Sequence, residues 1–182
     1  METLRRHRGW RCIQLSQPEE IDRFRINEAG RETFSLLKEL GMPDYKRTFK
    51  IWLRKFPRPI FIVCVDDREI LAWAYTEEWK DSAKDGEPVY VLRAIEISEE
   101  IRGRRLGYRL LLLICNLTPG YLITKPINED ARRFFLRYGF IEKDDFDRDP
   151  IDLRTHPDYL VLPPFKKKKL LEDMDDYFVE GE

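Results

Sequence analysis

The sequence predicts one α/β domain, with a mixed and largely antiparallel sheet of about six or seven strands and helices on both faces. Three observations support this fold class. Short apolar runs rich in β-branched and aromatic residues recur along the chain, polar turns separate them, and segments with helical spacing lie between them. A chain of 182 residues is long enough to bury one sizeable core but not two. We therefore expect a domain over residues 1–165, followed by a charged tail over 166–182 that either frays or docks as a helix.

The first sixty residues are expected to form one strand followed by helices. Residues 11–16 alternate well enough for a strand, and Pro18 with two following glutamates indicates a helix start. Apolar residues from 21 to 40 recur at loosely helical spacing, which predicts either one long helix or two short ones. Asp44 is expected to cap a further helix that Pro57 stops.

The middle of the chain is expected to supply the central strands. Residues 60–65 and 70–76 are apolar runs around a charged turn, so they predict a hairpin. Residues 89–98 predict a longer strand, and a leucine-rich helix follows it up to residue 117. A short strand is then expected over 121–125.

A second helix and two last strands complete the predicted fold. After Asn128, apolar residues follow the i, i+3, i+4, i+7 rule, and Gly139 stands at the position that ends such a helix. Residues 140–146 and 159–162 predict the two last strands.

Composition excludes several classes of protein. The 33 basic and 34 acidic residues give a net charge of −1, so there is no global bias toward nucleic acid or anionic membranes. The two histidines do not combine with the cysteines into a metal-binding pattern, and we expect no metal. Cys12, Cys64 and Cys115 are odd in number and far apart, which favours reduced thiols and no disulfide. No apolar run is long enough to span a membrane or act as a signal peptide, so the expected location is the cytoplasm.

The turn EEIRGRRLGYR, residues 99–109, has the composition of a phosphate-binding loop. It joins an apolar strand to an apolar helix and contains four arginines and two glycines. Such a turn places unpaired backbone N–H groups and the positive end of a helix dipole at one point. Gly103 and Gly107 allow close approach, and arginine can fork onto phosphate oxygens. A surface loop with solvated arginines is the simpler alternative.

The sequence around this turn resembles the GNAT superfamily of acyl-CoA-dependent N-acyltransferases. Ile95-Glu96-Ile97 leading into Arg102-Gly103-Arg104-Arg105-Leu106-Gly107 is similar to the family's [Arg/Gln]-x-x-Gly-x-[Gly/Ala] motif. The run Asn128-x-x-Ala131-x-x-Phe134-Phe135-x-x-Tyr138-Gly139-Phe140 is similar to its Asn-x-x-Ala-x-x-[Leu/Phe]-Tyr-x-x-x-Gly-Phe helix. The resemblance covers about residues 10–165, and the order of the elements also agrees with it.

The resemblance implies an acetyltransferase that binds acetyl-CoA and an amine together, with direct attack of the amine on the thioester. It implies a diphosphate on the backbone of the arginine loop and pantetheine along the strand that precedes it, with the Ile97 N–H contacting the acyl carbonyl. The residues expected to bind the cofactor are Ile95, Ile97, Arg102, Gly103, Arg104, Arg105, Leu106, Gly107, Tyr108, Asn128 and Phe135.

Two residues depart from the family pattern. Arg105 stands where the family usually has the first glycine of the motif, and Phe135 stands where many members carry a tyrosine that protonates the leaving thiolate. Tyr138, three residues after Phe135, is the candidate acid, with Tyr121, or departure of the thiolate without a dedicated acid, as the alternatives. Glu96, a carboxylate inside an apolar strand, is the candidate base, with an ion pair to an arginine such as Arg93 as the alternative.

Three questions stay open at this stage. The loss of tyrosine at 135 also fits a catalytically silent sensor that only binds CoA. The arginines of the loop, together with Lys166 to Lys169, also fit a nucleic-acid-binding module, although the balanced charge argues against one. Acidic residues between 77 and 87 suit a cationic acceptor, and the chain could be a monomer or a homodimer.

Overall fold

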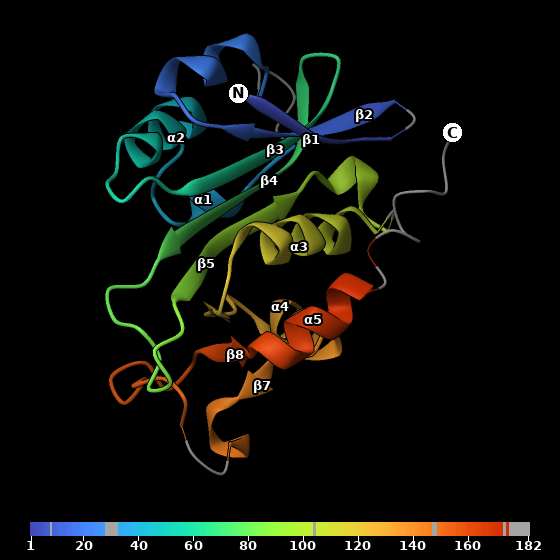
Figure 1. Cartoon of the computed structure of the whole chain (residues 1–182). Helices are drawn as coiled ribbons and strands as arrows, with labels where there is room; N and C mark the ends of the chain where they lie inside the picture. Colours follow the sequence, from blue (N-terminus) through green and yellow to red (C-terminus); the bar gives the residue numbers. More distant parts are fainter. Residues whose placement is uncertain (8, 28–32, 104, 147–148, 173, 175–182) are drawn as a thin grey trace.

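A single eight-stranded sheet with helices on both faces forms the protein (Figure 1). The computed structural model describes residues 1–7, 9–27, 33–103, 105–146, 149–172 and 174. The strands are β1 Glu2–His7, β2 Trp10–Leu15, β3 Ile60–Asp66, β4 Glu69–Glu78, β5 Val89–Ile97, β6 Tyr121–Thr124, β7 Ile141–Glu142 and β8 Leu160–Leu162. The predicted fold class is confirmed, with eight strands where six or seven were expected.

The sheet is antiparallel except at one place. Its strand order is β1-β2-β3-β4-β5-β6-β8-β7, and only β5 and β6 run parallel. That pair is joined over four residues of each strand, Val89–Leu92 with 121–124. The rest of β5 continues beyond the end of β6, which leaves a gap between these two strands.

The helices divide into two layers that cover opposite faces of the sheet (Figure 1). On one face lie the 3₁₀ helix η1 Pro18–Arg23 and the helices α1 Leu36–Glu39 and α2 Tyr45–Leu53. On the other face lie α3 Leu106–Leu117, α4 Glu129–Arg137 and α5 Pro164–Glu172. Side chains alternate along the central strands, so Trp73 and Tyr75 pack under α2 while Ala72 and Ala74 pack under α3.

Strand β1 is the element that the sequence did not reveal. Its sequence ETLRRH is charged, and the sequence predicted a single strand in this region, over residues 11–16. The strand lies at the edge of the sheet, pairs only with β2 and contains a register shift between Thr3 and Arg5. Charged side chains and bulges are common on edge strands because they prevent pairing with other chains, so this composition is compatible with a strand.

The expected helical region over 21–40 is largely non-helical. It contains the 3₁₀ helix η1, the four-residue helix α1 and extended segments in the described part between them. The apolar residues nevertheless face the core as predicted, because Ile21, Phe24 and Leu37 are all buried. The expectation for α2 is confirmed: Asp44 accepts a hydrogen bond from the backbone N–H of Arg47 at 3.0 Å and caps the helix.

The prediction of reduced cysteines was wrong for two of the three. Cys12 and Cys64 are register partners on the neighbouring strands β2 and β3 and form a disulfide, while Cys115 is free and buried in α3. The two bonded cysteines are separated by 52 positions. Only the pairing register brings them together, and the spacing of cysteines in the sequence does not show it.

The charged tail begins within the helix α5, which packs against α3. In α5, Lys167 is buried and its Nζ donates to the carbonyl oxygen of Thr118 at 2.6 Å and to the Thr118 hydroxyl at 3.2 Å. These contacts place a cation at the C-terminal end of α3, where a helix dipole favours one. Burial lowers the pKa of Lys167 to about 8.

Candidate active site

The gap beside β5 leaves backbone N–H groups of that strand without a partner strand. In an antiparallel ladder, hydrogen-bonded pairs alternate with pairs that point away from each other. Ser98 donates to the carbonyl of Leu71 on β4 at 2.9 Å, so that pair is hydrogen-bonded. The register Ala72 to Ile97 and Ala74 to Ile95 then directs the N–H groups of Ile95 and Ile97 away from β4. On that side β6 has already ended, opposite Leu92.

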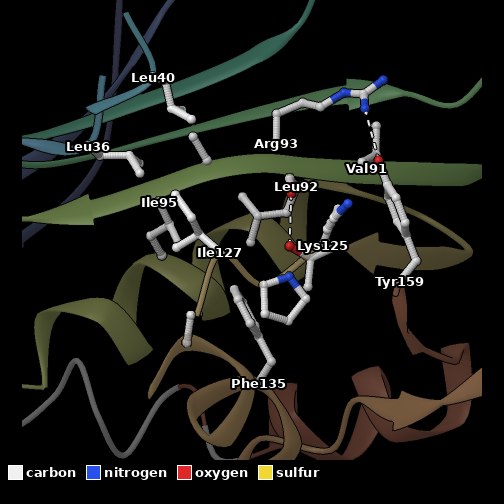
Figure 2. Close-up of a pocket in the computed structure, with 14 residues that line it drawn as sticks. Leu36, Leu40, Val91, Leu92, Arg93, Ile95, Lys125, Ile127, Phe135 and Tyr159 are labelled. Carbon is white, nitrogen blue, oxygen red and sulfur yellow. Dashed lines mark hydrogen bonds between the residues drawn. The ribbon is translucent and has the colours of Figure 1, made fainter. Parts of the chain in front are cut away.

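A cavity of about 400 Å³ occupies this gap (Figure 2). Apolar side chains from α1, β5 and α4 make up most of its wall, and its charged residues are Arg93 and Lys125. The lining residues are Leu36, Leu40, Val91, Leu92, Arg93, Ala94, Ile95, Thr124, Lys125, Pro126, Ile127, Ala131, Phe135 and Tyr159. The Thr124 hydroxyl, which also lines the cavity, donates to the Leu92 carbonyl at 2.9 Å, drawn as a dashed line in Figure 2.

The arginine loop forms the N-terminal end of α3, as predicted. Arg105 is the N-cap residue of this helix and has a left-handed backbone, with φ of 58° and ψ of 14°. This conformation favours glycine, which explains why the family usually has glycine there, but the chain adopts it with arginine. The first bond within the helix runs from the N–H of Arg109 to the carbonyl of Arg105. The N–H groups of residues 106–108 are therefore the ones that no helical carbonyl can reach.

A second hollow, of about 270 Å³, lies over this helix end. It borders β5 at Ile97 and α4 at Phe134 and Tyr138, so both hollows follow the same strand and the same helix. Its lining includes the predicted cofactor residues Ile97, Arg102, Gly103, Arg105, Leu106, Gly107 and Tyr108. The structure thus brings these residues together, and Ile95 and Phe135 line the neighbouring cavity. Arg104 lies outside the described residues.

Glu96 points to the face of β5 that α1 and α2 cover, away from α3 and the arginine loop, and is only 8% exposed. Its Oε1 accepts the backbone N–H groups of Ser35 and Leu36, both at 2.8 Å. Its Oε2 accepts the Tyr45 hydroxyl and the Trp73 Nε1–H, both at 3.1 Å. Burial raises the pKa of Glu96 above its usual range, and these four donors oppose that rise.

The other predicted site residues lie on α4. Asn128 accepts the Ala131 N–H at 2.9 Å through its Oδ1 and thereby caps the helix. Phe135 is buried and lies at the bottom of the cavity (Figure 2). The ring of Tyr138 stacks on Tyr108, with centroids 4.2 Å apart, and lines the hollow over the arginine loop.

Sequence reasoning missed the polar wall of the cavity, which Arg93 and Tyr159 form. Arg93 is the extra residue at a register shift in the β4–β5 pairing, and such a bulge redirects a side chain. Its Nε donates to Glu77 at 3.0 Å and its Nη1 donates to the Tyr159 hydroxyl at 3.3 Å (Figure 2). The suggested ion pair between Arg93 and Glu96 is therefore wrong. An arginine inside an apolar strand was the available signal, but the bulge cannot be read from the sequence.

Comparison with known protein families decides which family this site belongs to. The profile described as "Acetyltransferase (GNAT) family" matches residues 24–140, which include β5, the arginine loop and α4. The chain belongs to the GNAT acetyltransferase family. It is thus an acetyltransferase whose cosubstrate is acetyl-CoA and whose acceptor is an amine.

Solved structures with the same fold include GNAT toxins. A tyrosine-to-phenylalanine mutant of the toxin AtaT, bound to acetyl-CoA and to the C-terminus of the antitoxin AtaR, is 15% identical with a TM-score of 0.61. The alignment covers 89% of this chain and 98% of that one. The KacTA complex with DNA is 16% identical with a TM-score of 0.64, covering 90% and 99%. AtaT complexed with acetyl-methionyl-tRNAfMet is 14% identical with a TM-score of 0.55, covering 88% and 98%.

Two further comparisons complete these findings. A search among curated proteins gave no match. Every helix in the described part of the chain is too short or too polar to cross a membrane.

Proposed function

We propose that this GNAT protein holds the thioester of acetyl-CoA in the gap between β5 and β6 and transfers the acetyl group to an amine that attacks it directly. The observation that carries this proposal is the pair of backbone N–H groups of Ile95 and Ile97, which face the gap where β6 has ended. A fixed N–H aimed at a carbonyl oxygen stabilises the charge that develops there during attack. Ile97 lies nearer the arginine loop and Ile95 lies farther from it, so we assign the pantetheine contact to Ile97 and the oxyanion contact, which the sequence led us to expect at Ile97, to Ile95.

We propose that the diphosphate of CoA lies in the hollow over the arginine loop. The N–H groups of residues 106–108 and the positive end of the α3 dipole favour an anion at this point. Arg102 and Arg105 line the same hollow and add charge of the required sign. The order of the two hollows along β5, with Ile97 beside the loop and Ile95 beyond it, agrees with one extended cosubstrate.

The charge of the residues that line the cavity indicates which class of amine the cavity can accept. Among the described residues that line it, the charged ones, Arg93 and Lys125, are both cationic. Two of the acidic residues that suggested a cationic acceptor have partners of their own: Glu77 binds Lys55 and Arg93, and Asp85 accepts the Tyr121 hydroxyl at 2.8 Å. We therefore propose an amine with an apolar neighbouring group and a neutral or anionic remainder in place of a polyamine. An aminoacylated RNA is one amine of this class, and an acetylated aminoacyl-tRNA is named in the AtaT complex.

We keep Glu96 as the proposed base, acting on the amine through water. Its position on the face of α1 and α2 agrees with an acceptor that approaches from that side. However, a carboxylate offers about four acceptor positions, and four donors already occupy them. A water molecule has to displace one of them, so a purely positioning role for Glu96, which anchors α1 at the cavity wall, is the competing assignment.

A catalytically silent sensor is the second candidate function, and Phe135 is the observation that favours it. Its ring lies in the cavity where the family tyrosine would present its hydroxyl. A sensor would bind acetyl-CoA in the same way but would not release CoA when amines are added.

The decisive experiment is a thiol-release assay with acetyl-CoA and a panel of amines. The panel contains amino acid amides with apolar and acidic side chains, lysine peptides, a polyamine and an aminoacylated tRNA. We expect amine-dependent release of CoA with an apolar or anionic member, and a product heavier by one acetyl group. Binding of acetyl-CoA without turnover on any amine would favour the sensor.

We also propose a cytoplasmic location, since acetyl-CoA is made and used inside cells. The disulfide between Cys12 and Cys64 is compatible with this location. Intracellular disulfides are frequent in hyperthermophiles, and the 37% content of charged residues resembles that of heat-adapted proteins. Fractionation of the native cells would test the location directly.

A further inference from the structure

The cavity between β5 and β6 lacks a hydroxyl on α4 but has one on the opposite wall. Phe135 occupies the position of the family acid, and Tyr159, immediately before β8, lines the same cavity. Figure 2 shows the Tyr159 ring rising along the cavity to the level of β5, with its hydroxyl next to Arg93. The chain therefore presents a phenol to this space from a different element.

The hydrogen bond to Arg93 leaves the phenolic proton available. A guanidinium group can only donate, so in the 3.3 Å contact the Tyr159 oxygen is the acceptor. Its own O–H is then directed elsewhere. Glu77 and the Trp79 ring hold Arg93, with 3.0 Å from Nε to the Glu77 carboxylate and 5.5 Å from the guanidinium to the ring centroid. Because Arg93 is held in this way, its hydrogen bond also holds the Tyr159 hydroxyl in place.

The other polar groups of the cavity wall are less suited to give a proton. Thr124 already donates its hydroxyl proton to the Leu92 carbonyl. Arg93 does not lose a proton in proteins. Lys125 is largely exposed and pairs with Asp158 at 3.2 Å, outside the apolar part of the cavity. Tyr159 is therefore the lining residue best placed to give a proton to a thiolate, since its O–H is not committed to Arg93.

We propose that Tyr159 is the general acid of this enzyme and replaces the tyrosine that the family carries at position 135. The amine nitrogen forms a bond to the thioester carbon, the C–S bond then breaks, and the sulfur takes the phenolic proton as CoA leaves. Arg93 donates a hydrogen bond to the phenolate until it regains a proton from the attacking nitrogen through water. The products are the acetylated amine and CoA, so protons and electrons balance. This inference rests on the proposed acetyl transfer.

The test compares Tyr159→Phe with a variant that restores a phenol on the other wall. Tyr159→Phe keeps the ring contacts to Trp79 and His156, so the fold should survive, and melting temperature verifies this. We expect kcat to fall by about 100-fold with an unchanged KM for acetyl-CoA, which is the lower range for loss of a general acid. The double variant Tyr159→Phe with Phe135→Tyr should recover most of the activity. Tyr90→Phe, on the same strand as Arg93 but outside the cavity lining, is the matched control.

The outcomes separate this inference from the function on which it rests. If the wild type turns over and Tyr159→Phe has the same kcat, the acid role of Tyr159 is overturned but the proposed acetyl transfer is not. Loss of activity that Phe135→Tyr does not restore would mean that Tyr159 is structural, and would overturn it as well. If Tyr138→Phe abolished turnover while Tyr159→Phe did not, the general acid would be Tyr138, in the hollow over the arginine loop, and the proposal would be overturned. Absence of wild-type turnover with every amine would overturn both proposals.

Discussion

The Thr124 hydroxyl and the Leu92 carbonyl are joined by a 2.9 Å hydrogen bond at the last register pair between β5 and β6. Both residues are buried, and both line the cavity that opens beyond them. The bond therefore closes the sheet at the point where the active-site gap begins.

Replacing Thr124 by valine should destabilise the protein by about 1–2 kcal/mol, because the shape is kept but a buried carbonyl loses its partner. Urea unfolding of the variant measures this. Thr76→Val is the matched control: within the described part of the chain its buried hydroxyl has no hydrogen-bond partner, so valine there should be neutral or stabilising. Equal losses in the two variants would show that the bond to Leu92 contributes nothing specific.

Glu96→Gln should lower turnover by about two orders of magnitude, as expected for loss of a general base, with acetyl-CoA affinity nearly unchanged. The amide NH₂ of glutamine would also face a pair of donors, either the N–H groups of α1 or Tyr45 and Trp73, so stability should decrease as well. Turnover must therefore be normalised to folded protein. If the folded variant retains full activity across the pH range, Glu96 only positions α1.

Lys167 should make the stability depend on pH in the alkaline range. Below about pH 8 the lysine is protonated in both the folded and the unfolded state, so it adds no pH dependence. Between that pH and about 10.4, the usual lysine pKa, only the unfolded state holds the proton, so raising the pH favours the folded state. The wild type should gain about 1–3 kcal/mol over this range relative to Lys167→Met.

Chemical unfolding of both proteins at several pH values measures this difference. The neighbouring Cys115, whose pKa burial raises to about 12, is present in both proteins and largely cancels in the comparison. A difference that does not change with pH would show that Lys167 stays charged at the end of α3.

The disulfide should be visible as a thiol count and as a loss of stability on reduction. Denatured, unreduced protein should react with thiol reagents at one cysteine, Cys115, and reduced protein at three. The bond spans 52 positions, and closing a loop of this length stabilises the folded state by about 4 kcal/mol in the chain-entropy account. The double variant Cys12→Ala with Cys64→Ala should unfold at correspondingly lower urea concentration. Three reactive thiols without reduction would contradict the pairing.

Local patterns in the sequence predicted the part of the fold that they control. The hairpin of β3 and β4, the cap at Asp44, the helix after Asn128 and the arginine loop before α3 depend on residues close together in the chain, and each is present. Features that depend on register were missed. The edge strand β1, the bond between Cys12 and Cys64 and the bulge at Arg93 arise only when distant strands pair.

The residues of the candidate site also fall into two groups, those that contiguous motifs predicted and those that only the fold brings together. The predicted cofactor residues follow from two contiguous motifs, and those that the structure describes line or flank the two hollows. The acceptor side is built from α1, Arg93, Lys125 and Tyr159, which are far apart in sequence and match no motif. The direction in which Glu96 points was predictable from strand alternation, but its four hydrogen-bond donors were not.

A calorimetric titration with acetyl-CoA tests the central claim most directly, because every assigned role depends on the cosubstrate lying along β5 and over the arginine loop. We predict saturable binding of one molecule per chain, with affinity that weakens when Arg102 is replaced by alanine and stays unchanged in Arg154→Ala, whose arginine pairs with Asp152 away from both hollows. No detectable binding at millimolar acetyl-CoA, or binding that is indifferent to Arg102, would contradict the account.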